Sequence, residues 1–300
     1  MGSVTAERTR GSVSMRVSRF FFRHPHGRLG VLLGGPLAWF LIVYFGSLFV
    51  LFLSAFWGVD VFTSEIVRNW GFQNFKTLWE TDVYRTIALR TIGLAAAVTI
   101  TDIVLAFPLA YYAARMATPR RRNMILVAVI VPLWANYLVR VFSWKLILSP
   151  TGLLNWTVET LGIGSLQIAN SGWAIWLTFS YLWLPFTLLP IYGALERISP
   201  SFLEASGDLG ARGWMTFRRV VFPLIIPGIV AGSIFSFSLT LGDYIVPSLV
   251  GNTKFIGNVI YDNVGVANNV PFAAAYALVP VAVMAIYLLI AKRLGAFEAL

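Results

Sequence analysis

The chain has 300 residues, of which 58% are hydrophobic and 12% are charged, and its mean hydropathy is +0.75. Soluble domains are about half apolar and about a quarter charged, so this composition indicates a protein that crosses a membrane several times. The sequence has no cysteine, which excludes disulfides, thiolate nucleophiles and cysteine-ligated metals. The net charge of +10 is not evidence for nucleic-acid binding, because in a membrane protein the placement of positive residues matters more than their sum.

Six apolar runs are long enough to cross a hydrocarbon core about 30 Å thick, which takes about 20 helical residues. We expect them at about 31–57, 87–115, 124–148, 173–193, 225–250 and 272–291. The expected fold is all-α, with one transmembrane domain over 29–295 and a basic tail over 1–28. The first run is too long for a signal-peptide core, so we expect it to be retained as a span.

The positive residues predict the orientation. Placing the N-terminus inside puts 16 of the 23 arginines and lysines on the cytoplasmic side, so both termini are expected there. In the tail, Arg16, Arg19 and Arg23 recur at helical spacing, which fits either a helix lying at the membrane surface or an unstructured positive segment. The expected location is a bacterial cytoplasmic membrane, with lipid as a partner.

The sequence lacks the motifs that would indicate nucleotide hydrolysis, another catalytic activity or proton coupling. None of the four lysines follows a glycine, so the phosphate-binding G-x-x-x-x-G-K-[ST] loop is absent. Neither H-E-x-x-H nor G-x-S-x-G occurs, and no series of acidic residues and histidines follows the spans as a proton relay would. We therefore expect neither an enzyme nor an ion-coupled pump, and no bound metal or cofactor.

The loop at 196–223 carries charges and glycines between two apolar runs. Ser199 and Pro200 suit the start of a short helix, and Gly210 suits its end. A helix of this length is marginal in water without a surface to pack on. Trp214, Phe217 and Val221 form a second apolar face. The residues alone leave open whether the loop lies on lipid or docks on a partner.

The same loop resembles a signature of ABC importer permeases, E-A-A-x3-G-x9-I-x-L-P. The matching positions are Glu204, Ala205, Ser206, Gly210, Val220, Phe222 and Pro223, with Ser206, Val220 and Phe222 as conservative departures. In that family the first short helix docks on an ATPase subunit. The resemblance therefore implies an ATPase-coupling role for Glu204, Ala205, Ser206, Leu209 and Gly210, and it accounts for the missing phosphate loop.

Over about residues 29–295 the chain resembles, more narrowly, the spermidine/putrescine-type permease that is first of its pair. The stretches "LPIYGALERISPSFLEASGDLGA" and "LGDYIVPSLVGN" carry this likeness. It implies the type I importer fold, a second homologous permease, two ATP-binding subunits that use ATP and Mg, and an extracytoplasmic solute-binding protein. The implied cargo is a polyamine. Close relatives with opine, amino-acid-derivative or ferric-iron cargo remain alternatives, and so does a carrier that works alone.

Polar residues within the spans need an explanation, because a charge in hydrocarbon is costly. At about 1.5 Å per residue, Asp243 lies about 27 Å above the inner end of the fifth span, and Tyr137 and Arg140 lie about 20 to 24 Å along the third. One hypothesis is a passage for an ammonium group lined by Asp243, Trp134, Asn136, Tyr137 and Trp183. The other is an Arg140–Asp243 ion pair that acts as an outer gate or as a structural contact. Asp102 is a further candidate for the pathway.

Overall fold

The computed structural model describes residues 25–60 and 62–294. Their contacts divide the chain into two units, which meet after Ala55, and each is considered by itself. The helical part of the first unit comprises α2 (Pro25–Trp39), a π-helical turn η1 (Phe40–Phe45) and α3 (Gly46–Ser54). Residues Leu32–Ser54 within it are long and apolar enough to cross a membrane. The expectation for the tail over 1–28 falls almost entirely on residues 1–24, outside the described ranges.

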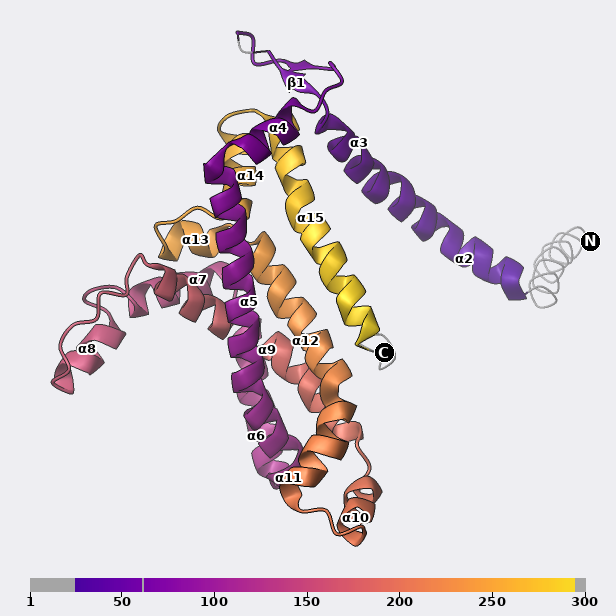
Figure 1. The fold of residues 1–300 in the computed structure, drawn as a ribbon, viewed down its shortest axis with the longest axis vertical. Helices are drawn as coiled ribbons and strands as arrows, with labels where there is room; N and C mark the ends of the chain where they lie inside the picture. The colour runs from indigo at the N-terminus through magenta and orange to yellow at the C-terminus, as the bar shows by residue number, and fades with distance from the viewer. Residues whose placement is uncertain (1–24, 61, 295–300) are drawn as a thin grey trace, which may run out of the picture. The chain divides into compact units, whose positions relative to one another are not determined.

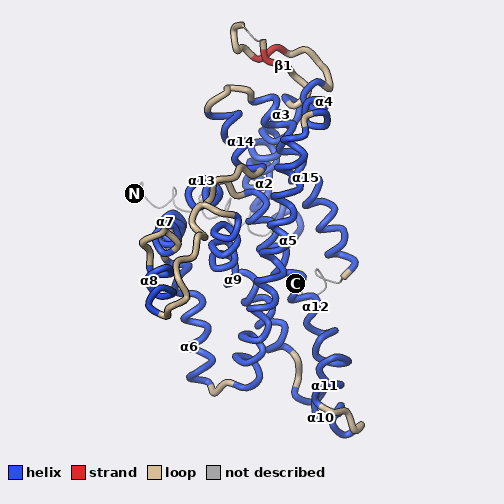
Figure 2. Tube along the Cα trace, turned by 60° about the vertical axis from the view of Figure 1, so that its left-hand side comes forward, coloured by secondary structure: helices blue, strands red, loops and turns tan. Residues whose placement is uncertain are grey.

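The second unit is built from helices joined by short connections (Figures 1 and 2). Its first elements are β1 (Gly58–Val59), β2 (Ile66–Val67), α4 (Gln73–Glu80), α5 (Asp82–Tyr111), η2 (Tyr112–Met116), α6 (Pro119–Ile130), η3 (Val131–Trp134), α7 (Tyr137–Ile147) and α8 (Leu153–Thr160). They are followed by α9 (Gly172–Arg197), α10 (Pro200–Asp208), α11 (Gly213–Thr216), η4 (Phe217–Val221), α12 (Phe222–Gly242), α13 (Ile245–Val250), α14 (Ile256–Gly265) and α15 (Val270–Arg293). The two strands pair antiparallel, Gly58 opposite Val67. The expected all-α class is therefore confirmed.

Helices α5, α9 and α12 form the centre of this unit and pack along one another. At the end near α10 and α11, buried residues of all three meet, among them Ala106 and Ala110 of α5, Leu188 and Ile191 of α9, and Ile225 of α12. A second cluster joins α5 and α9 to α7 and α13, and a third joins the start of α5 to α14 and α15. The apolar runs of the second unit thus pack into one bundle.

Small residues let α9 and α12 approach at backbone distance, as is common where helices pack in membranes. A Cβ atom added at Gly228 would lie 2.5 Å from the Cβ of Ala194 and 2.8 Å from the carbonyl oxygen of Pro190. One turn further, a Cβ at Gly232 would lie 2.8 Å from the carbonyl oxygen of Thr187. These contacts leave no room for a side chain at Gly228 or Gly232 of α12.

The third predicted span is broken in two. Pro119–Trp134 and Tyr137–Ile147 are bent by 100° at a gap of two residues, so the expectation of one straight helix over 124–148 is corrected. Pro132 lacks a backbone donor and lies in the 3₁₀ turn η3. Asn136 then restarts the helix, because its side chain accepts a hydrogen bond from the Leu138 amide at 2.9 Å. Height measured along a straight third span therefore does not apply to Tyr137 and Arg140.

The fifth predicted span begins earlier and ends earlier than 225–250. Helix continues from Gly213 to Gly242 without a break, through the π-helical turn η4, so Pro223 does not separate a loop helix from the span. At Asp243 the backbone is extended, with φ −75° and ψ 136°, and Pro247 belongs to the separate helix α13. Four further long apolar helices remain intact, and with the bent pair counted as one span the described residues hold up to six.

The close approach of α9 and α12 predicts an asymmetric response to alanine. Gly232→Ala should lower the free energy of unfolding by about 1 to 3 kcal/mol, because a Cβ there overlaps the α9 backbone. Gly193→Ala is the matched control on α9, since nothing lies within 4 Å of its added Cβ. Thermal unfolding of the detergent-purified chain, followed by size-exclusion chromatography, would measure both. Equal midpoints for the two variants would contradict this account of the packing.

Candidate functional site

Asp243 lies at the break between α12 and α13, and its carboxylate accepts hydrogen bonds from the backbone amides at the start of α13. Its Oδ1 accepts the amides of Ile245 at 2.8 Å and Val246 at 2.9 Å. Its Oδ2 accepts a hydrogen bond from the Tyr137 hydroxyl, at the start of α7. An acidic side chain that caps a helix start satisfies amides that would otherwise lack partners. The sequence predicted continuous helices at both places where the structure has a break, before α7 and before α13. The hydrogen bond from Tyr137 to Asp243 joins these two breaks.

Aromatic rings surround this hydrogen bond on the α9 side. The Tyr137 and Trp183 rings are stacked, with centroids 5.9 Å apart and planes 11° apart, and the Phe179 ring also stacks on Trp183, with centroids 6.3 Å apart. Trp183 is 6% exposed, while Asp243 and Tyr137 are half-buried. A carboxylate beside aromatic faces is the combination that receives an organic ammonium group.

The expected Arg140–Asp243 ion pair is not among the ion pairs of the described residues, which are Lys76–Glu80, Arg85–Asp82, Arg122–Glu196 and Lys254–Asp262. Tyr137 takes that place on the Asp243 carboxylate. Arg140 follows one turn later on α7, and its Cζ lies 6.0 Å from the centroid of the Tyr137 ring. The guanidinium therefore contacts the ring, and the hydroxyl of that ring contacts the acid.

The other pathway candidates are separate from this cluster. Trp134 is 85% exposed, and Asn136 is exposed and engaged in capping α7. Asp102 is 0% exposed between α5 and α12, where its Oδ2 accepts a hydrogen bond from the Ser236 hydroxyl at 2.6 Å. Its Oδ1 has no hydrogen-bond partner within the described ranges. The structure thus brings together Asp243, Tyr137 and Trp183 out of the six predicted residues.

Sequence reasoning missed the residues of α14 that support this break. The Asn258 side chain donates to the Tyr244 carbonyl at 2.9 Å and to the Ser248 hydroxyl at 2.6 Å. Tyr244 and Tyr261 stack with centroids 4.6 Å apart, and Gly257 lies against the carbonyl oxygens that end α12. The only signal was the motif "LGDYIVPS", which places Tyr244 next to the acid but does not show its partners on α14.

The charged loop contains the short helix α10, which starts and ends as expected. The Ser199 side chain accepts the Ser201 amide, Pro200 is the first helical residue, and the helix ends at Asp208. Gly210 has φ +75°, a left-handed conformation that a residue with a side chain adopts only at a cost. The chain turns there and enters α11.

The candidate coupling residues divide into an outer and an inner set. Glu204, Ala205, Leu209 and Gly210 are exposed, and Leu209 is 88% exposed. Ser206 is 8% exposed and faces inward, with its hydroxyl 2.9 Å from the Thr216 hydroxyl of α11. Exposed apolar residues gathered on a polar loop are typical of an interaction surface. Ser206, at the position where the family signature has alanine, therefore links α10 to α11, which continues into α12.

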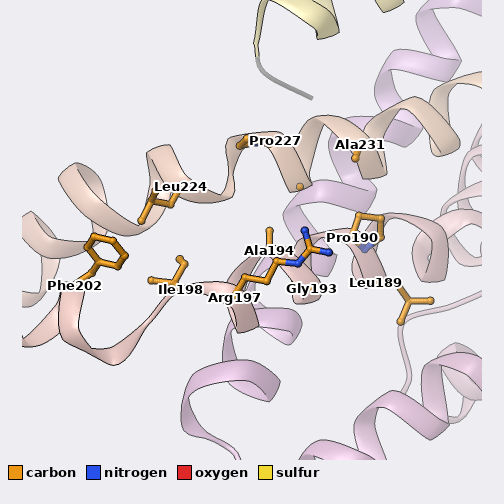
Figure 3. A pocket seen from close by; sticks show the side chains of 11 residues that line it. Leu189, Pro190, Gly193, Ala194, Arg197, Ile198, Phe202, Leu224, Pro227 and Ala231 are labelled. Carbon is orange, nitrogen blue, oxygen red and sulfur yellow. The ribbon is translucent and has the colours of Figure 1, made fainter. Parts of the chain in front are cut away.

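A pocket of about 390 Å³ lies between α9 and α12 beside this loop, as Figure 3 shows. Pro190, Gly193 and Arg197 line it from α9, Pro227 lines it from α12, and Phe202 of α10 lies at one end. Phe202 of α10 therefore borders open space, whereas Leu203 packs against the cluster formed by α5, α9 and α12.

The comparisons with known proteins decide the family. Residues 106–297 match the family described as "Binding-protein-dependent transport system inner membrane component". The chain belongs to this family. The matched residues include the α10 loop, the broken third span and the Asp243 break.

Two similar proteins are both named as transport permeases. The "Inner membrane ABC transporter permease protein YdcU" of Escherichia coli (strain K12) is 46% identical over 299 residues, which cover 95% of each chain. The "Spermidine/putrescine transport system permease protein PotB" of the same organism is 33% identical over 216 residues, 70% of this chain and 78% of the relative. The permease is therefore a multi-pass protein of the bacterial inner membrane. It is the non-catalytic permease subunit of an ABC importer, and ATP hydrolysis belongs to a partner ATPase.

A solved structure shows the same fold. A chain of the bacterial alginate ABC transporter, in complex with an alginate pentasaccharide-bound periplasmic protein, superposes with a TM-score of 0.72 at 18% identity. The match covers 93% of this permease and 97% of that chain. The type I importer fold expected from the sequence resemblance is confirmed.

The Ser206–Thr216 contact predicts a measurable coupling between two hydroxyl groups. Ser206→Ala and Thr216→Ala should each raise the amide hydrogen-exchange rate of α10, by about fivefold, because one hydrogen bond contributes about 1 kcal/mol. The double variant should add little to either single change, since both remove the same contact. Additive effects in this double-mutant cycle would show that the two hydroxyls act independently.

Proposed function

We propose that this permease forms part of an inward passage for a polyamine, such as spermidine or putrescine, or for a related compound with amino groups. A second homologous permease completes the passage, and a solute-binding protein delivers the cargo from outside. Two ATP-binding subunits, using ATP and Mg, drive the cycle through the α10 loop. These subunits are proposed from the resemblance to importer permeases.

The single observation that carries the cargo proposal is the half-buried carboxylate of Asp243, located at a helix break and flanked by the Tyr137 and Trp183 rings. A protonated amine gains attraction from the carboxylate and from the ring faces. The helix break also supports this role, because non-helical backbone in a membrane protein is found where it is buried in protein or lines a cavity.

The relatives support the same cargo class over its alternatives. The names of several relatives that are 31 to 34% identical state spermidine/putrescine transport, whereas the name of YdcU states no cargo. A ferric ion prefers several oxygen ligands, and this cluster offers one carboxylate beside aromatic rings. Opines and amino-acid derivatives share the ammonium group but carry a carboxylate, which the Asp243 side chain would repel.

The α10 loop supports the proposed coupling to an ATPase. Its exposed residues, Glu204, Ala205, Leu209 and Gly210, form a face that nothing else in the described chain covers. Leu209 lies directly before the left-handed turn at Gly210, so the turn fixes where this apolar side chain projects. A short helix with a fixed end and an exposed apolar residue suits insertion into a groove on another subunit.

The carboxylate predicts a loss of uptake when its charge is removed. Asp243→Asn, in a complex reconstituted with its partner subunits in liposomes, should lower spermidine uptake by about tenfold or more, because the amide attracts the ammonium group much less. Glu159→Gln removes an exposed carboxylate of α8 and should leave uptake unchanged. Unchanged uptake and unchanged ATPase stimulation in Asp243→Asn would remove this residue from the transport proposal.

The loop predicts a loss of ATPase capture when its turn is strained. Gly210→Ala forces a side chain into a left-handed conformation, at a cost of about 1 to 2 kcal/mol, and should reduce the ATPase recovered with the affinity-tagged permease. Glu204→Ala should do the same by removing a contact, whereas Asp208→Ala changes an exposed residue of the same helix and serves as control. If both loop variants keep the ATPase bound and uptake coupled, the proposed role of the loop is wrong.

A further inference from the structure

We propose that Arg115 is a positioning residue for transport, and that the end of α5, together with the turn η2 that continues it and contains Arg115, carries movement of α10 into the bundle. This inference rests on the proposed coupling role of the α10 loop. It assigns a role to a helix that is not next to the loop in the chain, since the spans that flank the loop are α9 and α12.

Arg115 holds the point where α9 passes into α10. Its Nη2 donates to the carbonyl oxygens of Leu195 at 2.6 Å and Ile198 at 2.7 Å. The last carbonyls of a helix lack partners within it, and a cation near a helix C-terminus is favourable. Ser199, the next residue, caps α10. The guanidinium therefore fixes both the end of α9 and the start of the coupling helix.

The same end of α5 also holds the other side of the loop. The Phe217 ring of η4 lies 5.6 Å from Phe107 and 6.4 Å from Tyr111, measured between centroids, and Trp214 stacks on Phe217 at 5.4 Å. Phe107 and Tyr111 of α5 and Arg115 of η2 are spaced four residues apart, which places them along one side of the continuous helix that the two elements form. One stripe of α5 thus touches the chain before α10 and the chain after it.

Helix α10 packs on the bundle through Leu203, which lies against the cluster formed by α5, α9 and α12, and its Phe202 borders the pocket. The pocket between α9 and α12 has Phe202 at the end where Ile198 and Leu224 also line it (Figure 3). Helix α10 packs on α11 and η4, and the Ser206–Thr216 contact is part of that packing. Because α11 and η4 continue into α12, movement of α10 reaches α12 directly. Ile198 and Phe217, on the two sides of α10, also both contact the stripe on α5.

At its other end α5 contacts α14, which in turn contacts the Asp243 break. Thr91 accepts a hydrogen bond from the Ile256 amide at 3.1 Å, at the start of α14. Two residues on, Asn258 holds the Tyr244 carbonyl at 2.9 Å. Figure 1 shows α5 running from α14 to α11 through the centre of the bundle. One helix thus connects the two sites that the transport cycle has to coordinate.

The test separates hydrolysis from uptake in the full complex, reconstituted in liposomes with its ATP-binding subunits and binding protein. Arg115→Met keeps the length of the side chain but cannot donate, and we expect the ratio of spermidine taken up to ATP hydrolysed to fall about tenfold while the ATPase stays bound. Arg115→Lys donates from a single point and should give an intermediate ratio. Arg120→Met, at an exposed position nearby, should match the wild type.

Each outcome has a definite meaning. A wild-type ratio in Arg115→Met overturns the inference, and if that variant does not fold, a wild-type ratio in Arg115→Lys overturns it instead. Uptake and hydrolysis that fall together, at an unchanged ratio, also overturn it, because they show a merely structural role. Failure of the proposed coupling is distinct, because the ATPase would then stay bound and coupled in the Gly210→Ala complex.

Discussion

The structure depends on one constraint, that every backbone amide and carbonyl inside a membrane needs a partner within the protein. An unpaired group in hydrocarbon costs several kcal/mol, so a helix that breaks there requires a cap at the break. Asn136 caps α7, and Asp243 supplies its carboxylate to the amides that start α13. Capping is thus what makes the irregular centre of the molecule possible, and it is also what brings a carboxylate beside two aromatic rings.

Away from these breaks, α5, α9 and α12 are regular helices that pack closely along one another. Gly228 and Gly232 bring α12 against the backbone of α9, so the central helices have little freedom to slide independently. Close-packed interiors transmit displacement rather than absorb it. The two irregular regions, at Asp243 and at α10, therefore lie at the ends of closely packed elements.

The sequence was sufficient for those features that depend on local chemistry. Apolar length predicted the spans, and Ser199, Pro200 and Gly210 predicted where α10 starts and ends. It was insufficient where a polar residue within an apolar run satisfies the backbone. Asn136 and Asp243 are predicted from the sequence to line a passage, and the structure adds that both also cap helices, which the sequence pattern does not reveal. The partnership of Tyr137 with Asp243 joins residues 106 positions apart, which spacing along the chain does not reveal. The Arg140 ion pair was the obvious choice by charge, but the Tyr137 hydroxyl reaches the acid.

The exposure of Leu209 has a consequence for the life of the subunit before it is assembled. A leucine that is 88% exposed at the tip of a charged loop, with Trp214 also largely exposed close by in the chain, is an apolar surface presented to the cytoplasm. Such surfaces are what chaperones and proteases recognise on incomplete proteins. Under the proposed docking of an ATP-binding subunit on this loop, a permease made in excess of that subunit would keep the surface exposed and be removed.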